Sequence, residues 1–140
     1  MKLKTLTLFI AILLSSGIVF GEIVATMDEV MKPTTIVIDK DQIYLVEKTT
    51  IYIYDAKTYK FKKKFGKQGE GPGEFNFFAS ILPYRDQLLI NSFGKISYYS
   101  RQGDMIREQK IKSSMAAPSV MLFPVKDGFV GRGTRFEDKE

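Results

Sequence analysis

The sequence predicts an all-β fold built from β-propeller blades, each of them a sheet of four antiparallel strands. The main observation is an internal repeat, because residues 35–66 recur at an offset of 45 positions. Asp-Gln-Ile-Tyr at residues 41–44 matches Asp-Gln-Leu-Leu at residues 86–89, and a third match begins at residue 126. A period of roughly 40 to 45 residues is typical of four-stranded propeller blades. The apolar residues alternate or run continuously, so these stretches do not predict helices.

The first repeat predicts four short strands separated by polar turns. Its apolar runs are rich in β-branched and aromatic residues, which are typical of strands. The expected strands are residues 36–38, 42–46, 51–54 and 59–65, with turns at residues 39–41, 47–50 and 55–57. The third strand is Ile-Tyr-Ile-Tyr and is therefore apolar on both faces. Such a strand must be covered on both sides, which the stacking of successive blades provides.

The fourth strand of this repeat is rich in lysine. We expect Tyr59, Phe61, Lys63 and Phe65 to share one face and Lys60, Lys62 and Lys64 to share the other. An outermost blade strand fits this pattern, since lysines on an edge strand discourage pairing with other molecules. Together with Lys67 these lysines could instead bind a polyanion, but a solvated edge is the commoner role of such a cluster.

The second and third repeats follow the same plan. In the second repeat, strands are expected at residues 78–83, 87–91, 95–99 and 105–111. In the third, two strands are expected at residues 120–125 and 129–131, with no closing strand after them. The predicted organisation is blade 33–75, blade 76–117 and incomplete blade 118–140. A closed propeller has roughly four to eight blades, so we expect this chain to be the N-terminal part of a longer protein.

The first 21 residues predict an export signal. Lys2 and Lys4 give a positive start, residues 6–20 are almost entirely apolar, and small or modest side chains precede the expected cleavage after Gly21. The apolar run of 15 residues spans about 22 Å as a helix, short of the roughly 30 Å hydrocarbon core of a bilayer. We therefore expect a periplasmic or extracellular protein, with a retained membrane anchor as the alternative. Residues 22–32 form a lead-in, expected to pair with a strand or to make a turn of helix.

Cys and His are both absent from the sequence, which excludes several kinds of site. Without Cys there is no lipoprotein anchor, disulfide or thiolate metal site. Without His there is no His-ligated zinc, Ser-His-Asp triad or Cys-His dyad. Loss of Lys2 and Lys4 with the signal lowers the formal net charge from +5 to +3, which is too weakly basic to predict a nucleic-acid partner. We expect no cofactor.

Residues 33–75 carry the pattern of a known family. They begin as Pro-x-x-Ile-x-Ile-Asp, continue after a polar turn with Ile-Tyr-Leu-Val at residues 43–46, and end in a glycine-rich loop closed by Phe75. This unit resembles a repeat of the NHL-like six-bladed β-propeller proteins. The resemblance implies an incomplete six-bladed propeller, of which this chain holds about two and a half blades. After the loop the family usually has a proline, whereas this chain has Asn-Phe-Phe at residues 76–78, so the subfamily stays open.

The glycine-rich loop, residues 66–75, is expected to cross from one blade to the next. Glycine at four of its positions permits positive φ and close approach of backbones. A phosphate cradle is the alternative, but the P-loop and dinucleotide fingerprints are absent and no helix is expected after the loop. We expect Phe75 to anchor the loop between the blades and not to stack on a ligand.

Aspartates lie in most of the expected turns. We expect them to cap the backbone of their own turns, and not to bind calcium or act as acids or bases. They are Asp39, Asp41, Asp55, Asp86, Asp104 and Asp127. Some propeller hydrolases hold calcium in the central channel, and Glu47 and Asn91 are the candidates for that role, because both lie near the ends of second strands.

The sequence favours a binding or scaffold module over an enzyme, because no catalytic constellation is present. The expected partner is a protein, a peptide or a glycan, bound through the loop face of the propeller. The alternative is a hydrolase or lyase with a channel metal, whose catalytic residues lie mainly in further blades. The candidate contacts on the loop face are Glu47, Lys67, Glu70, Glu74 and Asn91.

Overall fold

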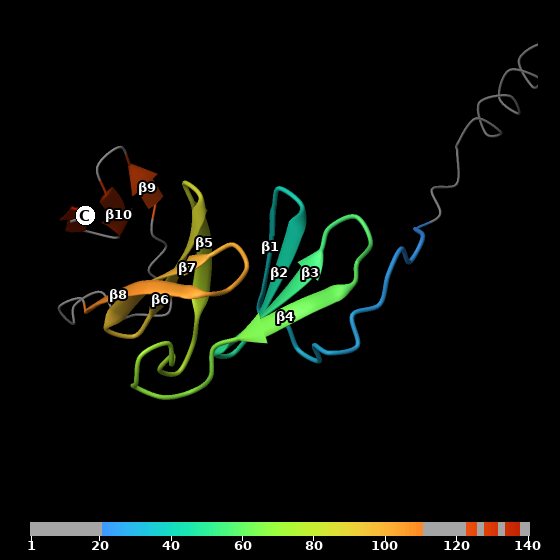
Figure 1. Cartoon of the computed structure of the whole chain (residues 1–140), viewed down its shortest axis with the longest axis horizontal. Coiled ribbons are helices and arrows are strands. Elements are labelled where there is room, and N and C mark those ends of the chain that lie inside the picture. Colours follow the sequence, from blue (N-terminus) through green and yellow to red (C-terminus); the bar gives the residue numbers. More distant parts are fainter. Residues whose placement is uncertain (1–20, 111–122, 126–127, 132–133, 138–140) are drawn as a thin grey trace, which may run out of the picture.

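The computed structural model describes residues 21–110, 123–125, 128–131 and 134–137 of the chain. Two four-stranded antiparallel sheets lie next to each other, and a smaller sheet follows them (Figure 1). The first sheet, blade 1, contains β1 (Thr35–Asp39), β2 (Gln42–Glu47), β3 (Thr50–Asp55) and β4 (Phe61–Phe65). The second sheet, blade 2, contains β5 (Ser80–Tyr84), β6 (Gln87–Ser92), β7 (Lys95–Ser100) and β8 (Met105–Lys110). The all-β prediction of four-stranded blades is confirmed.

The third sheet has one strand more than the sequence predicted. It contains β9 (Phe123–Val125), β10 (Gly128–Gly131) and β11 (Thr134–Glu137), in the order β11-β10-β9. The expectation that no strand follows residues 129–131 was therefore wrong. The segment Thr-Arg-Phe-Glu of β11 has one apolar residue among polar ones and carries a weak strand signal of its own. Antiparallel pairing with β10 stabilises this strand through backbone hydrogen bonds, which do not depend on its side-chain pattern.

The register of strand pairing repeats with the sequence. Tyr44 pairs with Ile53 in blade 1, and Leu89 pairs with Tyr98 in blade 2, at the same offset of 45 residues. Because side chains alternate along a strand, a slip by one residue would turn the apolar set to the wrong face. The repeat in sequence is thus a repeat of register as well as of strand order.

Strand β3 is buried on both faces, as its sequence predicted. Toward blade 2, Ile51 and Ile53 pack in a cluster with Leu88 and Ile90. Full burial of each large aliphatic side chain stabilises the fold by about 1.5 to 3 kcal/mol, so this interface is a main part of the core. The tyrosines of β3 occupy the other face, where Met27 of the lead-in packs against their cluster. One face is covered by a second blade and the other by an irregular segment.

The lead-in segment, residues 22–32, makes a single turn and forms no strand or helix. Val30 N donates to Met27 O at 3.3 Å within this turn. The Tyr54 hydroxyl of blade 1 donates to the Glu29 carboxylate at 2.8 Å. The expected strand pairing or helical turn is therefore wrong. The Glu29 carboxylate and the Lys32 N–H are bound by side chains of blade 1, and the apolar side chains of the lead-in have no regular spacing.

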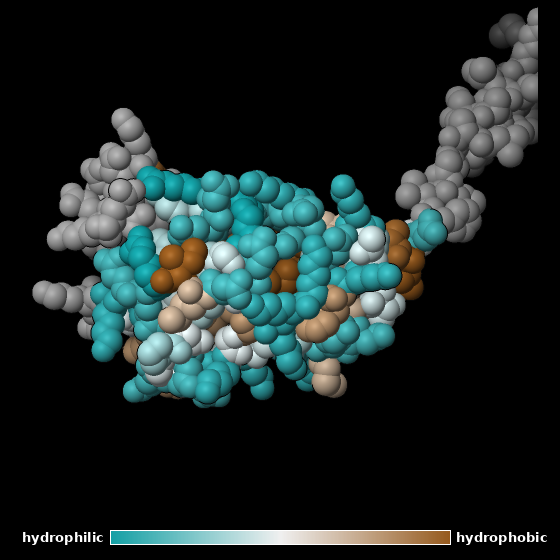
Figure 2. Space-filling model, in the orientation of Figure 1, coloured by the Kyte–Doolittle hydropathy of each residue, from teal (hydrophilic) through white to brown (hydrophobic). Residues whose placement is uncertain are grey.

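Strand β4 is the outer strand of blade 1, and its lysines are exposed, as the sequence predicted. Figure 2 shows a largely hydrophilic surface over this side of the molecule. The predicted faces of β4 are wrong in part, because a register shift places Lys63 opposite Ile53 but Phe61 opposite Tyr54. Phe61 therefore shares the face of Tyr54, with the ring centroids 5.5 Å apart. A bulge adds one unpaired residue to a strand, which sequence alternation does not reveal.

Asp55 caps its own turn, as the sequence predicted. Its carboxylate accepts the N–H groups of Lys57 and Thr58 at 3.0 and 2.9 Å, and it also pairs with Lys62 at 2.9 Å. These contacts, of which the Thr58 amide is the largest, hold the pKa of Asp55 well below its usual range.

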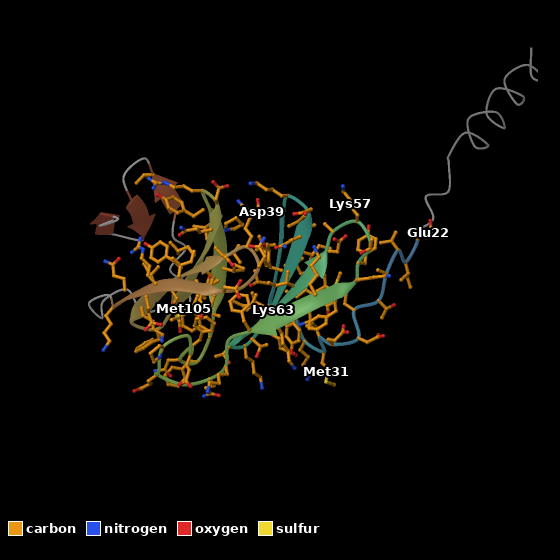
Figure 3. All side chains as sticks on the ribbon, in the orientation of Figure 1. Glu22, Met31, Asp39, Lys57, Lys63 and Met105 are labelled. Atoms are coloured by element: carbon orange, nitrogen blue, oxygen red, sulfur yellow. The ribbon has the colours of Figure 1, made fainter. Side chains whose placement is uncertain are left out.

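Three other aspartates form ion pairs between the blades. The pairs are Lys40–Asp86 at 3.3 Å, Lys63–Asp104 at 2.6 Å and Arg101–Asp39. In each pair one residue belongs to blade 1 and the other to blade 2. Asp39 lies at the end of β1, beside the β1–β2 turn (Figure 3). We call this end of the sheets the turn rim. Asp104 also accepts the Ser100 hydroxyl of its own turn at 3.3 Å, so its predicted turn role holds in part. The sequence did not predict the cations that bind these aspartates, because they come from the neighbouring blade and a pattern within one repeat cannot show them.

Some sequence predictions fall outside the described part of the chain. They are the export signal at residues 1–20 and the turn role of Asp127. Among the residues that the structure describes, no helix is long and apolar enough to cross a membrane.

Candidate functional site

The loop face lies where the chain crosses from blade 1 to blade 2. It is formed by the crossing loop, residues 66–79, the β2–β3 turn and the β6–β7 turn. Ala79 N donates to Lys48 O in the β2–β3 turn at 2.9 Å, which fixes the loop to blade 1. The predicted role of the glycine-rich segment as a crossing between blades is confirmed.

Phe75 anchors the crossing loop between the blades, as the sequence predicted. Its side chain is fully buried in the cluster that joins the two sheets, with its ring centroid 6.1 Å from that of Tyr99. Gly66 has φ +81, and a Cβ there would lie 2.5 Å from both the Phe75 ring and Thr49 O. Glycine is therefore required at this position, because the backbone conformation and the space both exclude a side chain.

Lys67 and Glu74, two of the predicted contacts, bind each other. The Lys67 ammonium lies 2.7 Å from one Glu74 oxygen, and the Gly71 N–H donates to the other at 3.0 Å. The ammonium first, and then the amide, hold the pKa of the Glu74 carboxyl below its ordinary value. This carboxylate closes the loop on itself, so the pair shapes the loop face.

Glu47 and Asn91 do not come together in the structure. Glu47 lies on the face of β2 that points away from blade 2, where its carboxylate accepts Lys32 N at 2.7 Å. Asn91 is 4% exposed and follows Ile90, which faces blade 1, so Asn91 faces away from blade 1. At the offset of 45 residues the equivalent of Glu47 is Ser92 and not Asn91. Asn91 lies one position earlier in its strand, so its side chain points to the opposite face of the sheet. Among the described residues no three carboxylates gather in a way that could hold a metal ion.

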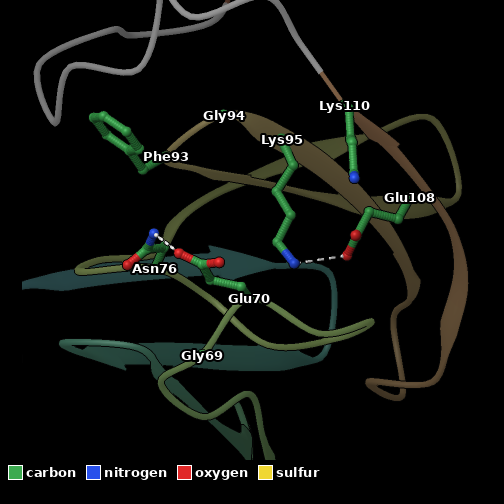
Figure 4. Close-up of a pocket in the computed structure, with 8 residues that line it drawn as sticks. All are labelled: Gly69, Glu70, Asn76, Phe93, Gly94, Lys95, Glu108 and Lys110. Carbon is green, nitrogen blue, oxygen red and sulfur yellow. Dashed lines mark hydrogen bonds and ion pairs between the residues drawn. The ribbon is translucent and has the colours of Figure 1, made fainter.

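A cavity of about 280 Å³ opens on the loop face beside Glu70 (Figure 4). Glu70 and Asn76 line it from the crossing loop, Phe93 from the β6–β7 turn, and Glu108 and Lys110 from β8. The Asn76 amide donates to the Glu70 carboxylate at 3.4 Å. Of the five predicted contacts, Glu70 is the one that lines this cavity.

Lys95 is a buried cation in the wall of the cavity. Its side chain is 7% exposed, lies 3.0 Å from the Glu108 carboxylate and donates to Gly71 O at 2.9 Å. The same carboxylate accepts Ser97 Oγ at 3.2 Å and Gly73 N at 3.4 Å. A buried charge without its partner would be strongly destabilising, so this network holds β7, β8 and the crossing loop in one arrangement. The sequence did not predict this network, because its members lie on three segments.

An exposed pair of phenylalanines borders the cavity. Phe77 is 69% exposed and Phe93 is 46% exposed, and their rings meet edge to face with centroids 5.9 Å apart. Phe77 also has φ +63, a conformation that is costly for a bulky side chain. Neither ring was among the contacts predicted from the sequence. The signal for Phe77 was Asn-Phe-Phe at residues 76–78, whereas Phe93 had no signal of its own in the sequence.

The stacked four-stranded sheets and their connection by one crossing loop are the arrangement of propeller blades. The model of the family DUF5128, described as a 6-bladed beta-propeller, matches residues 25–128. The chain belongs to this family. The match spans both complete blades, and the expectation of a six-bladed family is confirmed, while the NHL-like subfamily stays a prediction. No curated protein matches the chain.

Proposed function

We propose that this member of the six-bladed β-propeller family is an exported binding module that recognises a protein, a peptide or a glycan through its loop face. The cavity beside Glu70 carries the proposal. Hollows in which a few polar groups converge next to aromatic side chains are the usual form of a ligand site. Export rests on the apolar run that follows Lys2 and Lys4.

The crossing loop supports this function because its shape is fixed by contacts within the protein. Phe75 holds it between the blades, and the Lys67–Glu74 pair closes it. A loop that is already ordered does not lose conformational freedom when a ligand binds, so more of the contact energy appears as affinity. Glu70 and Asn76 are thus presented on a prearranged surface.

Binding of the full chain to arrays of immobilised glycans and peptides tests this function. The loop-face variant combines Glu70→Ala with Asn76→Ala, and the control is Lys57→Ala in the exposed β3–β4 turn on the opposite rim (Figure 3). We expect at least one ligand class to bind, with a signal that falls in the loop-face variant and stays in the control. Absence of binding, or binding that only the Lys57 variant weakens, would contradict a loop-face site.

A further inference from the structure

The aromatic border of the cavity offers a flat apolar surface to a ligand. Phe93 lines the cavity and keeps almost half of its surface exposed. Its edge-to-face contact with Phe77 orients the ring without covering it completely. The β6–β7 turn that carries Phe93 therefore presents a ring to whatever enters the cavity.

The polar border offers both donors and acceptors, and its charges cancel. The ionisable side chains that line the cavity are Glu70, Lys95, Glu108 and Lys110, two acids and two bases. Lys95 and Glu108 already neutralise each other at 3.0 Å. The Asn76 amide adds an uncharged donor and acceptor. A strongly charged ligand would meet a side chain of its own charge sign at close range, either Glu70 or Lys110, so the site suits a neutral, hydroxyl-rich ligand.

The size of the cavity limits what can enter. Its volume of about 280 Å³ is slightly below the roughly 300 to 1,000 Å³ typical of small-molecule sites. A single small unit fits such a space, whereas an extended ligand must continue outside it.

We propose that this cavity binds one neutral hexopyranose unit of a glycan, with an apolar face of the sugar on Phe93 and its hydroxyls toward Glu70, Asn76 and Lys110. A pyranose ring combines an apolar C–H face with a rim of hydroxyl groups, which matches the ring on one side of the cavity and the polar groups on the other. This inference rests on the proposed binding function of the loop face, and it selects the glycan among the three classes of partner.

Saturation-transfer difference NMR on the full chain tests the proposal. The probes are D-glucose, D-galactose and N-acetyl-D-glucosamine as neutral sugars, D-glucuronate as a charged sugar, and tripeptides of neutral side chains. We expect a neutral sugar to bind more tightly than glucuronate and the tripeptides. Phe93→Leu keeps the apolar volume but removes the ring, and we expect it to weaken that sugar by about threefold to tenfold. Phe93→Tyr should retain binding.

The control variant is Phe61→Leu, which removes a partly exposed ring of β4 at 39% exposure, outside the cavity. It should leave sugar binding unchanged, and thermal unfolding shows that each variant is folded. Tripeptide binding that depends on Phe93 would overturn the glycan proposal and leave loop-face binding intact. Sugar binding indifferent to Phe93→Leu, or tighter binding of glucuronate, would overturn the proposed site. If no probe binds, the glycan proposal fails, and the arrays described above decide whether the loop face binds any ligand. If both Phe93 variants also unfold at lower temperature, the ring serves the core.

Discussion

The β2–β3 turn of blade 1 and the β6–β7 turn of blade 2 occupy the same place in the repeat but differ in their surroundings. Thr49 in the first turn is 6% exposed, and Gly66 of the crossing loop lies against its carbonyl. Gly94, 45 residues further on, has open space where a Cβ would stand, and Phe93 beside it is exposed. One turn is covered by the crossing loop, and the other lines the cavity.

The comparison shows which part of a blade is free to vary. The strands keep their register at the offset of 45 residues, since a slip would expose the core. The turns do not keep the same backbone conformation at this offset. The residue with positive φ is Lys48 in the first turn, but Gly94, one position beyond the equivalent residue, in the second. A covered turn contributes to stability, whereas an uncovered one is available for a ligand. Substitutions around the two turns should therefore separate stability from binding.

The largest expected effect is that of Phe75→Ala, which removes the side chain that holds the loop over the β2–β3 turn. Loss of a fully buried phenylalanine lowers the free energy of unfolding by about 3 to 5 kcal/mol. Urea denaturation followed by circular dichroism measures the change. Phe61→Ala is the control, because that ring is partly exposed and its loss should cost clearly less. Equal losses in both variants would mean that Phe75 is not a special anchor.

Gly66→Ala should have the next largest effect. The new methyl group would meet the Phe75 ring and Thr49 O at 2.5 Å in a positive-φ conformation, so we expect a loss of about 1 to 3 kcal/mol from overpacking and strain. Gly71→Ala is the matched control within the same loop, since its φ is not positive and the nearest atoms that a Cβ there would meet belong to the Glu74 side chain, at 3.0 Å, and not to the backbone. The same denaturation curves measure both variants, and a neutral Gly66→Ala would show that the turn is less tightly covered than the structure indicates.

Gly94→Ala tests the open turn in the same way. Its φ of +80 disfavours a side chain, but a Cβ would meet nothing within 4 Å. We therefore expect only the backbone strain, about 1 kcal/mol, and a smaller loss than for Gly66→Ala when the two midpoints are compared. A loss as large as that of Gly66→Ala would show that the β6–β7 turn is covered too.

Phe93→Leu should leave the free energy of unfolding within about 0.5 kcal/mol of the original, because the ring is exposed. Phe93→Leu should instead weaken ligand binding. A thermal melt of this variant beside Phe75→Ala measures the contrast between the two aromatic residues of the loop face. A drop comparable with that of Phe75→Ala would place Phe93 in the core.

The smallest expected effect concerns pH. The folded-state pKa of Glu74 is lowered by Lys67 and Gly71, so the contribution of this contact is complete above the ordinary carboxyl pKa of about 4.5. It is lost as the pH falls through the lowered folded-state pKa. The amide shift of Gly71 in a pH titration by NMR should follow this loss. Glu74→Gln should flatten the titration curve, and a Gly71 shift that persists in this variant would point to another titrating group.

The fold was largely predictable from the sequence because strand signals repeat at a fixed period. The predicted strands at residues 42–46 and 51–54 match β2 and β3 to within one residue at each end. The role of Phe75 was also predictable, since an aromatic residue that closes a glycine-rich loop between two blades can be buried in the apolar interface between them. What failed in β4 was the alternation of faces, because one bulged residue moves Phe61 across the sheet.

The candidate site was predictable only at Glu70. The cavity joins residues from the crossing loop, the β6–β7 turn and β8, and no pattern within one repeat brings these three segments together. Lys95 and Glu108 are neutralised by each other, yet in the sequence they are two charges 13 positions apart. Long-range partners of this kind become visible only once the two blades are packed.

The ion pairs on the turn rim make the joint between the blades asymmetric. The chain connects blade 1 to blade 2 through the loop face, whereas Lys40–Asp86 and Arg101–Asp39 join them near the β1–β2 turn and Lys63–Asp104 joins them at the middle of β4. Dissolved salt screens exposed charges but leaves a peptide connection unchanged. High ionic strength should therefore weaken the exposed Lys40–Asp86 and Lys63–Asp104 pairs more than the largely buried Arg101–Asp39 pair. The apolar cluster between the sheets should keep the two blades together at any salt concentration, so the salt dependence of stability measures the exposed pairs alone.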